Sequence, residues 1–401
     1  MRDTAAALLL AALTASTVAG HSSAQEASRP RARDVGLVVG VFPTGEHNAI
    51  TDVAGVRVGH ATVVEGDSIR TGVTAIIPHE GNLYWEPVPA WIHSGNAYGK
   101  LIGETQVREF GEIETPILLT CTLCVWSAAE GLADYLLSRP GESEHTINPI
   151  VGETNDSWVS DMWADPVQFE HVRQALEDAT GGPVEEGSVG GGTGTSAFGW
   201  KGGIGTSSRV LPDALGGYTV GVLVQTNFGG ILSMNGAPVG RELGMYSYRR
   251  QIEGSPGLEE NAPEDGGSIM IVAATDAPLT PLNLERFAER AMLGVARTGS
   301  FAHNSSGDYV IAFSTAEAVR RVRSSDTPQP MEALLNPSMS PLFLAIVEAT
   351  EEAIYNAMFK AATISGRGHT LEALPLEQTL AILREYSVLN WDRTLSPGRD
   401  Q

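Results

Sequence analysis

A serine at position 268 stands where a polar loop meets an apolar run, and it is the first candidate for chemistry in this sequence. Residues 253–265 hold five acidic residues, two prolines, two glycines and no basic residue, whereas residues 269–274 are all apolar. This change predicts a loop followed by a buried strand that begins at the serine. Ser268 is then either an ordinary strand-start residue or a nucleophile that becomes a new N-terminus when the bond after Gly267 is cut. In the second case the freed α-amine, whose ordinary pKa is about 8, is a general base beside its own hydroxyl.

Further polar residues follow or open other apolar segments, namely Glu153, Asn227, Ser306 and Asp308. Strand ends flanked by glycine-rich loops are where catalytic sites are commonly assembled. Taken singly, each residue also has an ordinary structural explanation, as a solvated carboxylate, a turn-stabilising amide or part of a Ser-Ser-Gly-Asp turn.

Signatures of several other enzyme classes are absent from the sequence. There is no Gly-x-Ser-x-Gly pentapeptide of an α/β-hydrolase and no His-Glu-x-x-His of a zinc peptidase. The glycine-rich stretch 186–209 has no Gly-Lys-Ser/Thr, which excludes a phosphate-binding loop of that type. Its glycines instead predict close approach of backbone segments around a site.

The elements that must position these residues alternate along the chain. Strand-like segments are expected at residues 35–39, 48–64, 71–78, 117–125, 149–153, 218–229 and 309–313 and in the run that begins at Ser268. Helices are expected at residues 96–110, 128–137, 169–179, 283–296, 340–363 and 375–386, the longest with one apolar face. About eight strands mixed with five or six helices predict an α/β fold with sheets covered by helices on both faces. Because no linker or repeat is apparent, we expect one large domain.

The two cysteines, Cys121 and Cys124, have a spacing that suits a redox pair or half of a zinc site. No second cysteine pair and no His-x-x-x-His pair accompanies them, so we expect no metal. Since Thr and Leu between them continue the apolar segment 117–125, we expect two buried cysteines in a core strand, and their redox state stays open.

Composition and charge narrow the class of protein. Hydrophobic residues make up 42% and charged residues 18% of the 401 residues, which is typical of a globular protein. A formal charge of −22 repels phosphate backbones and argues against a nucleic-acid partner, and no segment after the first twenty residues is long enough to span a membrane. Arg2, the apolar residues 5–20 and Ser22-Ser23-Ala24 predict a signal peptide at residues 1–24 and a periplasmic protein.

Eight stretches in chain order give the sequence a resemblance to a known family: residues 48–60, 152–156, 186–190, 198–209, 224–229, 236–241, 267–279 and 306–315. They resemble the β-aminopeptidases and L-aminopeptidase/D-amidase-esterases, self-processing relatives of the N-terminal-nucleophile hydrolases. The resemblance implies a four-layer α-β-β-α sandwich without metal or cofactor. It also implies cleavage into an α chain of residues 25–267 and a β chain of residues 268–401 that stay associated. Such αβ heterodimers are expected to form a homo-oligomer, a tetramer.

The resemblance also implies a role for each candidate residue. Ser268 matches the nucleophile, and Ser306 and Asp308 match the pair that orients the nucleophile and its amine. Asn227 matches the amide that stabilises the oxyanion, and Glu153 matches the carboxylate that receives the ammonium group of the substrate. In relatives the acid at position 308 can be Glu, so the shorter Asp308 is expected to sit differently.

The sequence therefore predicts an exported, self-processing aminopeptidase that removes β-amino acids or small L-amino acids from short peptides and amides. The alternative enzyme is an acyltransferase of the ornithine-acetyltransferase type, whose nucleophile is threonine. A binding protein of the same fold is a third possibility, and it would lack cleavage. The preference among β-, L- and D-amino acids cannot be read from the sequence.

Overall fold

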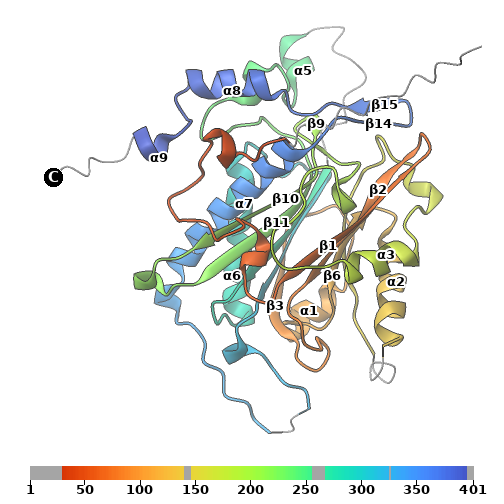
Figure 1. Ribbon diagram of the computed structural model, residues 1–401, viewed down its shortest axis with the longest axis vertical. Helices are drawn as coiled ribbons and strands as arrows, with labels where there is room; N and C mark the ends of the chain where they lie inside the picture. Colours follow the sequence, from red (N-terminus) through yellow and green to blue (C-terminus); the bar gives the residue numbers. More distant parts are fainter. Residues whose placement is uncertain (1–28, 140–145, 255–266, 325–326, 395–401) are drawn as a thin grey trace, which may run out of the picture.

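Two β-sheets packed face to face form the centre of the protein, and helices cover the outer face of each sheet (Figure 1). The computed structural model describes residues 29–139, 146–254, 267–324 and 327–394. The predicted signal peptide, residues 1–24, and most of the acidic segment before Ser268 lie outside the described residues.

The first sheet has five strands in the order β1-β2-β6-β7-β4. Their bounds are Arg57–Glu65 (β1), Ile69–Ile77 (β2), Ile117–Cys121 (β6), Ile150–Thr154 (β7) and Leu101–Ile102 (β4). The second sheet has six strands in the order β10-β11-β12-β13-β3-β5. Their bounds are Ile204–Val210 (β10), Thr219–Asn227 (β11), Gly267–Thr275 (β12), Ser306–Ser314 (β13), Val88–Ala97 (β3) and Glu112–Ile113 (β5).

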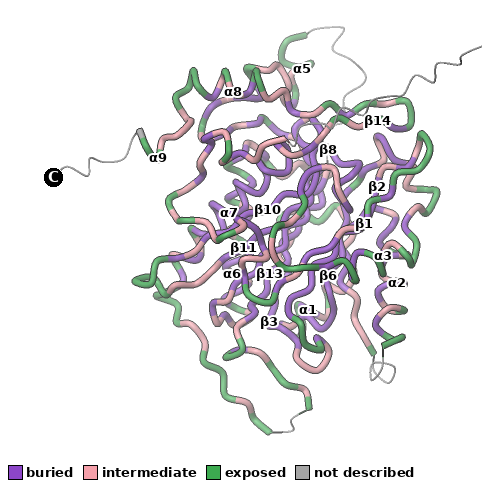
Figure 2. Tube along the Cα trace, viewed as in Figure 1, coloured by how far each residue is buried: buried purple, intermediate pink, exposed green. Residues whose placement is uncertain are grey.

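Three layers of buried apolar side chains separate the four layers of secondary structure. The middle layer lies between the sheets, where residues such as Leu119 of β6 and Met270 of β12 are fully buried. The outer layers pack α2 (Val125–Leu137) and α3 (Phe169–Glu177) on the first sheet, and α6 (Pro281–Arg297) and α7 (Ser340–Lys360) on the second. Figure 2 shows the buried residues gathered along the sheets. The predicted α-β-β-α sandwich is confirmed.

The described chain also contains shorter helices and strands. They are α1 (Glu104–Phe110), α4 (Val239–Glu242), α5 (Arg249–Glu253), α8 (Leu376–Glu385), α9 (Trp391–Thr394), β8 (Ser196–Ala197), β9 (Trp200–Lys201), β14 (Ile364–Gly366) and β15 (His369–Leu371). Among the described residues no helix is both long and apolar enough to cross a membrane.

Helix α6 shows how local sequence sets these elements. Its N-cap residue Thr280 accepts a hydrogen bond from the N–H of Asn283, and Pro281 occupies the first turn, where a missing N–H costs nothing. Leu284, Phe287 and Ala291 then recur at helical spacing and face the core. The helix predicted at residues 283–296 is therefore confirmed with slightly wider bounds.

The prediction of one strand over residues 117–125 is wrong. Strand β6 ends at Cys121, Thr122 and Leu123 form a turn, and α2 begins at Val125. Cys121 and Cys124 are joined by a disulfide across this turn. The apolar character of the segment reflects burial of the turn against the helix layer, which a run of apolar residues cannot distinguish from a strand.

Three other local predictions need correction. Of the strand expected at residues 48–64, only the part from Arg57 onward is extended, as β1, and Ile50–Asp52 form a 3₁₀ turn. Residues 96–110 are helical only from Glu104 to Phe110, because β3 extends to Ala97 and β4 intervenes. Residues 35–39 form no strand; the chain there follows a single 3₁₀ turn, Arg33–Val35. In residues 96–110 the pairing of β3 with β13 and of β4 with β7, and not local propensity, decides the structure.

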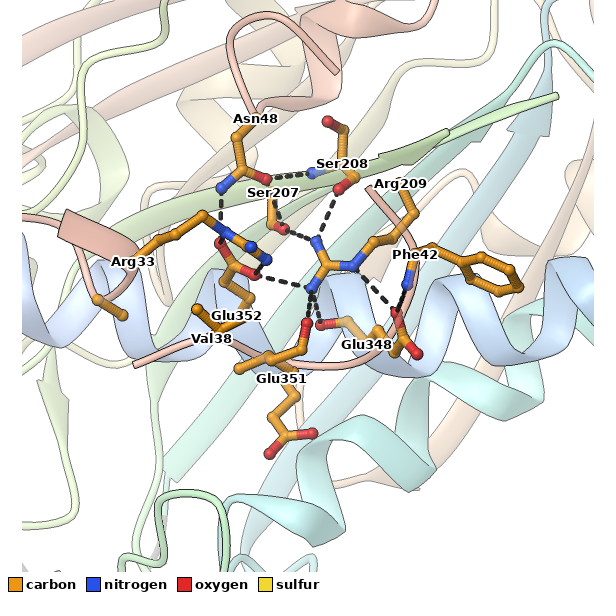
Figure 3. A network of polar contacts seen from close by, with 12 residues as sticks. Arg33, Val38, Phe42, Asn48, Ser207, Ser208, Arg209, Glu348, Glu351 and Glu352 are labelled. Atoms are coloured by element: carbon orange, nitrogen blue, oxygen red, sulfur yellow. Dashed lines mark hydrogen bonds and ion pairs between the residues drawn. The ribbon is translucent and has the colours of Figure 1, made fainter. Parts of the chain in front are cut away.

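Helix α7 differs from the amphipathic helix that the sequence predicts, because its polar side is buried as well. Arg209 of β10 is fully buried and pairs with Glu348 at 3.1 Å and with Glu352 at 2.7 Å, both from α7. Glu352 also accepts from Arg33 at 2.6 Å and from the Asn48 amide at 2.6 Å (Figure 3). Buried charges of this kind persist only when paired and hydrogen-bonded, so the network fixes the N-terminal segment, β10 and α7 to one another.

Candidate active site

Ser268 lies at the start of the central strand of the second sheet, next to two of the other predicted site residues. In the antiparallel pair of β11 and β12, Asn227 is opposite Ser268. In the parallel pair of β12 and β13, Ser306 is opposite Gly267. The end of β11 and the starts of β12 and β13 therefore meet at one edge of the sheet, which brings together residues that are distant in sequence.

The Ser268 hydroxyl is directly beside the peptide bond that precedes it. Its Oγ donates to the Gly267 carbonyl oxygen at 2.6 Å and accepts from the Gly307 N–H at 3.3 Å. Gly267 has a φ of +147°, and an added Cβ would lie 1.8 Å from the Asn227 carbonyl oxygen. Because that neighbour is backbone, only glycine fits at position 267 without separating the two strands.

Ser306 and Asp308 form a buried pair at the start of β13. The Ser306 hydroxyl donates to Oδ1 of Asp308 at 2.5 Å, and both side chains are buried. Burial raises the pKa of Asp308 to about 6, against the opposing effects of the Ser306 hydroxyl and the Ile269 N–H. The carboxylate is therefore ionised at neutral pH and loses its charge in mildly acidic solution.

The side-chain amide of Asn227 is held in one orientation. Its Oδ1 accepts from the backbone N–H of Ser196 at 2.9 Å. Since the oxygen end of the amide is used in this way, the –NH₂ end remains as a hydrogen-bond donor. Ser196 belongs to the glycine-rich stretch, where Gly203 approaches so closely that an added Cβ would lie 2.2 Å from the Gly187 carbonyl oxygen. The predicted close approach of backbone segments is confirmed.

Glu153 reaches the same site from the other sheet. It lies in β7, its side chain is 2% exposed, and its Oε1 accepts from the backbone N–H of Lys100 at 3.0 Å. A Cβ on Gly99 would lie 3.2 Å from this oxygen and 3.1 Å from the Cα of Gly307, and a Cβ on Gly307 would lie 3.2 Å from Oγ of Ser268. Two glycines without side chains thus keep the carboxylate close to the serine hydroxyl.

A buried acid–base pair lies beside the segment that holds Asn227. Lys201, opposite Ser196 in the hairpin of β8 and β9, is fully buried and donates to the carbonyl oxygens of Gly192 and Gly202, each at 2.8 Å. Burial lowers the pKa of Lys201 to about 7 and raises that of the buried Asp156 to about 7. Lys201 and Ser196 were not among the predicted site residues, although Lys201 belongs to residues 198–209, which carry the family resemblance, and Ser196 belongs to the glycine-rich stretch 186–209.

The structure thus brings Ser268, Asn227, Ser306 and Asp308 together at one sheet edge, with Glu153 entering from the opposing sheet. The individual roles of these five residues stay predictions. Within the described ranges, no group of three or more His, Cys, Asp or Glu side chains is placed to hold a metal ion. An activated serine with its own hydrogen-bond donors can carry out acyl transfer.

Comparison with known proteins identifies the same group of enzymes that the sequence motifs indicate. The profile described as peptidase family S58 matches residues 48–371. The beta-peptidyl aminopeptidase BapA of Sphingosinicella microcystinivorans is 40% identical over 382 residues, which cover 91% of this chain and 94% of that protein.

Solved structures of similar enzymes share the fold. The beta-aminopeptidase of a Burkholderia species has a TM-score of 0.80 and 39% identity, over 89% of this chain and 99% of its own. The L-aminopeptidase D-Ala-esterase/amidase of Ochrobactrum anthropi also has a TM-score of 0.80, with 36% identity over 90% of this chain and 100% of its own. That protein is described as a prototype for the serine aminopeptidases and as a new variant of the Ntn hydrolase fold.

Proposed function

Because this chain belongs to peptidase family S58 and is an aminopeptidase, we propose that it cuts itself at Gly267–Ser268 and then uses Ser268 as an N-terminal nucleophile. The proposed products are an α chain that ends at Gly267 and a β chain that begins at Ser268. The observation that carries the proposal is the position of the Ser268 hydroxyl, 2.6 Å from the Gly267 carbonyl oxygen, at a backbone conformation that only glycine adopts.

Self-cleavage follows from that position in two steps. Oγ of Ser268 attacks the carbonyl carbon of Gly267, the C–N bond breaks, and the acyl group moves from nitrogen to oxygen as an ester. Water then hydrolyses the ester, which leaves the Gly267 carboxylate and restores the Ser268 hydroxyl. The nitrogen released in the first step becomes the free α-amine of Ser268.

The freed amine supplies the base that turnover needs. It takes the proton from Oγ of Ser268 as the oxygen attacks the carbonyl of the first residue of the substrate. The –NH₂ group of Asn227 donates to the developing oxyanion, an interaction that typically contributes ~3 kcal/mol. The same amine protonates the departing peptide and later activates the water that releases the first residue. Ser306 and Asp308 orient the serine and its amine.

Recognition of the substrate depends on its positive end. We assign this role to Glu153, because a buried carboxylate binds an ammonium group through a charge-assisted hydrogen bond. The names of the relatives support N-terminal β-amino acids or small L-amino acids in short peptides and amides. From the sequence we further propose export through residues 1–24 to the periplasm and an oligomer, a tetramer, of αβ heterodimers. The acyltransferase alternative is disfavoured, because the nucleophile position is serine and the family match is to peptidases.

The intact mass of the purified protein tests this proposal. We expect two chains from the wild type, the smaller beginning at Ser268, and a single inactive chain from Ser268→Ala. Ser365→Ala, which changes an exposed serine in β14, is the matched control and should be cut and active like the wild type. Comparison of β-alanyl, L-alanyl and D-alanyl amides then defines the substrate preference. A full-length wild-type chain with undiminished activity would refute the mechanism.

A further inference from the structure

Lys100 forms an ion pair with Glu153, the carboxylate that we propose binds the ammonium group of the substrate. Its backbone N–H holds Oε1 of Glu153 at 3.0 Å, and its Nζ lies 3.6 Å from the same oxygen. The lysine side chain is 37% exposed, whereas the glutamate side chain is 2% exposed. The backbone contact fixes the carboxylate, whereas the lysine side chain that pairs with it is partly exposed to solvent.

A second partner for the lysine lies on the turn that follows β6. Nζ of Lys100 donates to Oγ1 of Thr122 at 3.2 Å. Thr122 sits inside the turn that the Cys121–Cys124 disulfide closes, so this acceptor is attached to a rigid support. The ammonium group of Lys100 can therefore leave Glu153 and keep a hydrogen bond to Thr122 together with its contact to water.

The other carboxylate oxygen of Glu153 has space for a new donor. Oε2 is buried, and it has no hydrogen-bond partner among the described residues. An unsatisfied buried acceptor is costly, so this oxygen favours any donor that enters the site. Glu153 is separated from Gly307 and the Ser268 hydroxyl by Gly99, which contributes no side chain. A substrate ammonium group that binds this carboxylate is therefore close to the proposed nucleophile.

The surroundings of Glu153 are otherwise acidic. Its charge acts on the pKa of Asp156 and, with Glu104 and Asp308, on that of Tyr309. In the described part of the chain, Lys100 is the cation within ion-pair distance of Glu153. Two cations on one carboxylate repel each other at these distances, so a second ammonium group weakens the hold of the first.

We propose that Lys100 is a built-in competitor that occupies Glu153 in the free enzyme and is displaced towards Thr122 by the N-terminal ammonium of the substrate. This inference rests on the proposed role of Glu153. It makes Lys100 a specificity-determining residue, because a blocked, uncharged N-terminus cannot displace a lysine from a carboxylate. The lysine also keeps the buried charge of Glu153 paired whenever the site has no substrate.

The test compares neutral variants of Lys100 with the wild type, using the mature enzyme and a β-alanyl amide at pH 8. For Lys100→Met and Lys100→Gln we expect KM to fall about tenfold, equivalent to about 1.4 kcal/mol, with kcat within twofold. Lys100→Arg keeps the cation and should keep the wild-type KM. Arg173→Met removes one exposed positive charge from the outer helix α3 and is the matched charge control.

Glu153→Gln separates this inference from the function on which it rests. If Glu153→Gln leaves KM unchanged, the role of Glu153 itself is wrong. If Glu153→Gln raises KM but the neutral Lys100 variants leave it unchanged or raise it, the competitor role alone is overturned. Failure of both neutral variants to fold would also overturn it, because Lys100 would then be a structural counter-ion. In the Glu153→Gln background, Lys100→Met should have no further effect on KM.

Discussion

Replacement of Gly267 by alanine tests the geometry of the proposed cleavage site. The new Cβ would lie 1.8 Å from the carbonyl oxygen of Asn227 and 2.8 Å from the Cα of Phe228. Real Cβ atoms stay at least 3.0 Å from such atoms, so β12 must move from β11 by about 1.2 Å or more at this point. All of these neighbours are backbone atoms, and no side-chain rotation can relieve the contact.

A displacement of this size moves the reacting atoms themselves, because the attacked carbonyl belongs to residue 267 and the attacking hydroxyl belongs to the next residue, Ser268. A misplacement of about 1 Å can cost about 100-fold in rate. We therefore expect Gly267→Ala to slow self-cleavage by about 100-fold or more. The left-handed conformation of an alanine adds a destabilisation of about 1–3 kcal/mol.

The assay is a time course of intact mass on freshly purified precursor, with the uncut fraction plotted against time. Gly368→Ala is the matched control, because Gly368 also has a positive φ, +78°, but has no atom within 4 Å of an added Cβ. It should be cut at the wild-type rate. After cleavage the β chain of Gly267→Ala is identical to the wild type, so turnover per cut molecule should be preserved. Cleavage of Gly267→Ala within threefold of the wild-type rate would show that this reading of the site is incorrect.

Two further predictions follow from buried charges. Burial raises the pKa of Asp308 to about 6. We therefore expect kcat/KM to fall with uptake of one proton between pH 8 and 6, as the α-amine protonates, and to fall more steeply below pH 6, where Asp308 also loses its charge. Asp308→Asn should lose the steeper fall below pH 6, and a steeper fall that persists in this variant would contradict the assignment. Arg209→Met removes the arginine that pairs with Glu348 and Glu352, and Arg33 remains on Glu352. It should lower the free energy of unfolding by about 3–5 kcal/mol in urea titrations, against at most ~0.5 kcal/mol for the exposed pair lost in Arg173→Met. An Arg209→Met loss below 1 kcal/mol would mean that the buried network is not stabilised by this arginine.

Local patterns in the sequence were sufficient to predict the strands that carry the site. Ser268 opens a run of apolar residues and Asn227 ends a predicted strand, because a buried strand leaves its polar residues at its ends. Ser306 and Asp308 were predicted in a turn before the strand at residues 309–313, and the structure includes both in β13. The convergence of these three ends requires the strand order β11-β12-β13, which no local pattern encodes. Only the family resemblance supplied that information.

Interactions between distant segments explain what sequence reasoning could not predict. The acidic face of α7 looks solvated in the sequence, yet Glu348 and Glu352 are buried because Arg209 arrives from β10. The same holds for Lys100 and Ser196, whose backbone N–H groups hold the side chains of Glu153 and Asn227 from segments distant in the sequence. Polar residues that are buried because they pair with a distant partner follow no helical or strand periodicity. Each of them therefore looks in the sequence like an ordinary surface residue.

The dimensions of the site depend on three glycines that come from different parts of the chain. At positions 99, 267 and 307 an added Cβ would meet, respectively, Oε1 of Glu153, the backbone of Asn227 and Oγ of Ser268. The first and the last of these atoms lie on opposite sheets, and under the proposed roles they face the ammonium end and the carbonyl end of the bound substrate residue. The gap between the sheets at Gly99 therefore limits how many backbone atoms of the substrate can lie between its ammonium group and its carbonyl group. The comparison of β-alanyl and L-alanyl amides tests this limit, because one additional methylene lengthens the part of the substrate that must fit the gap.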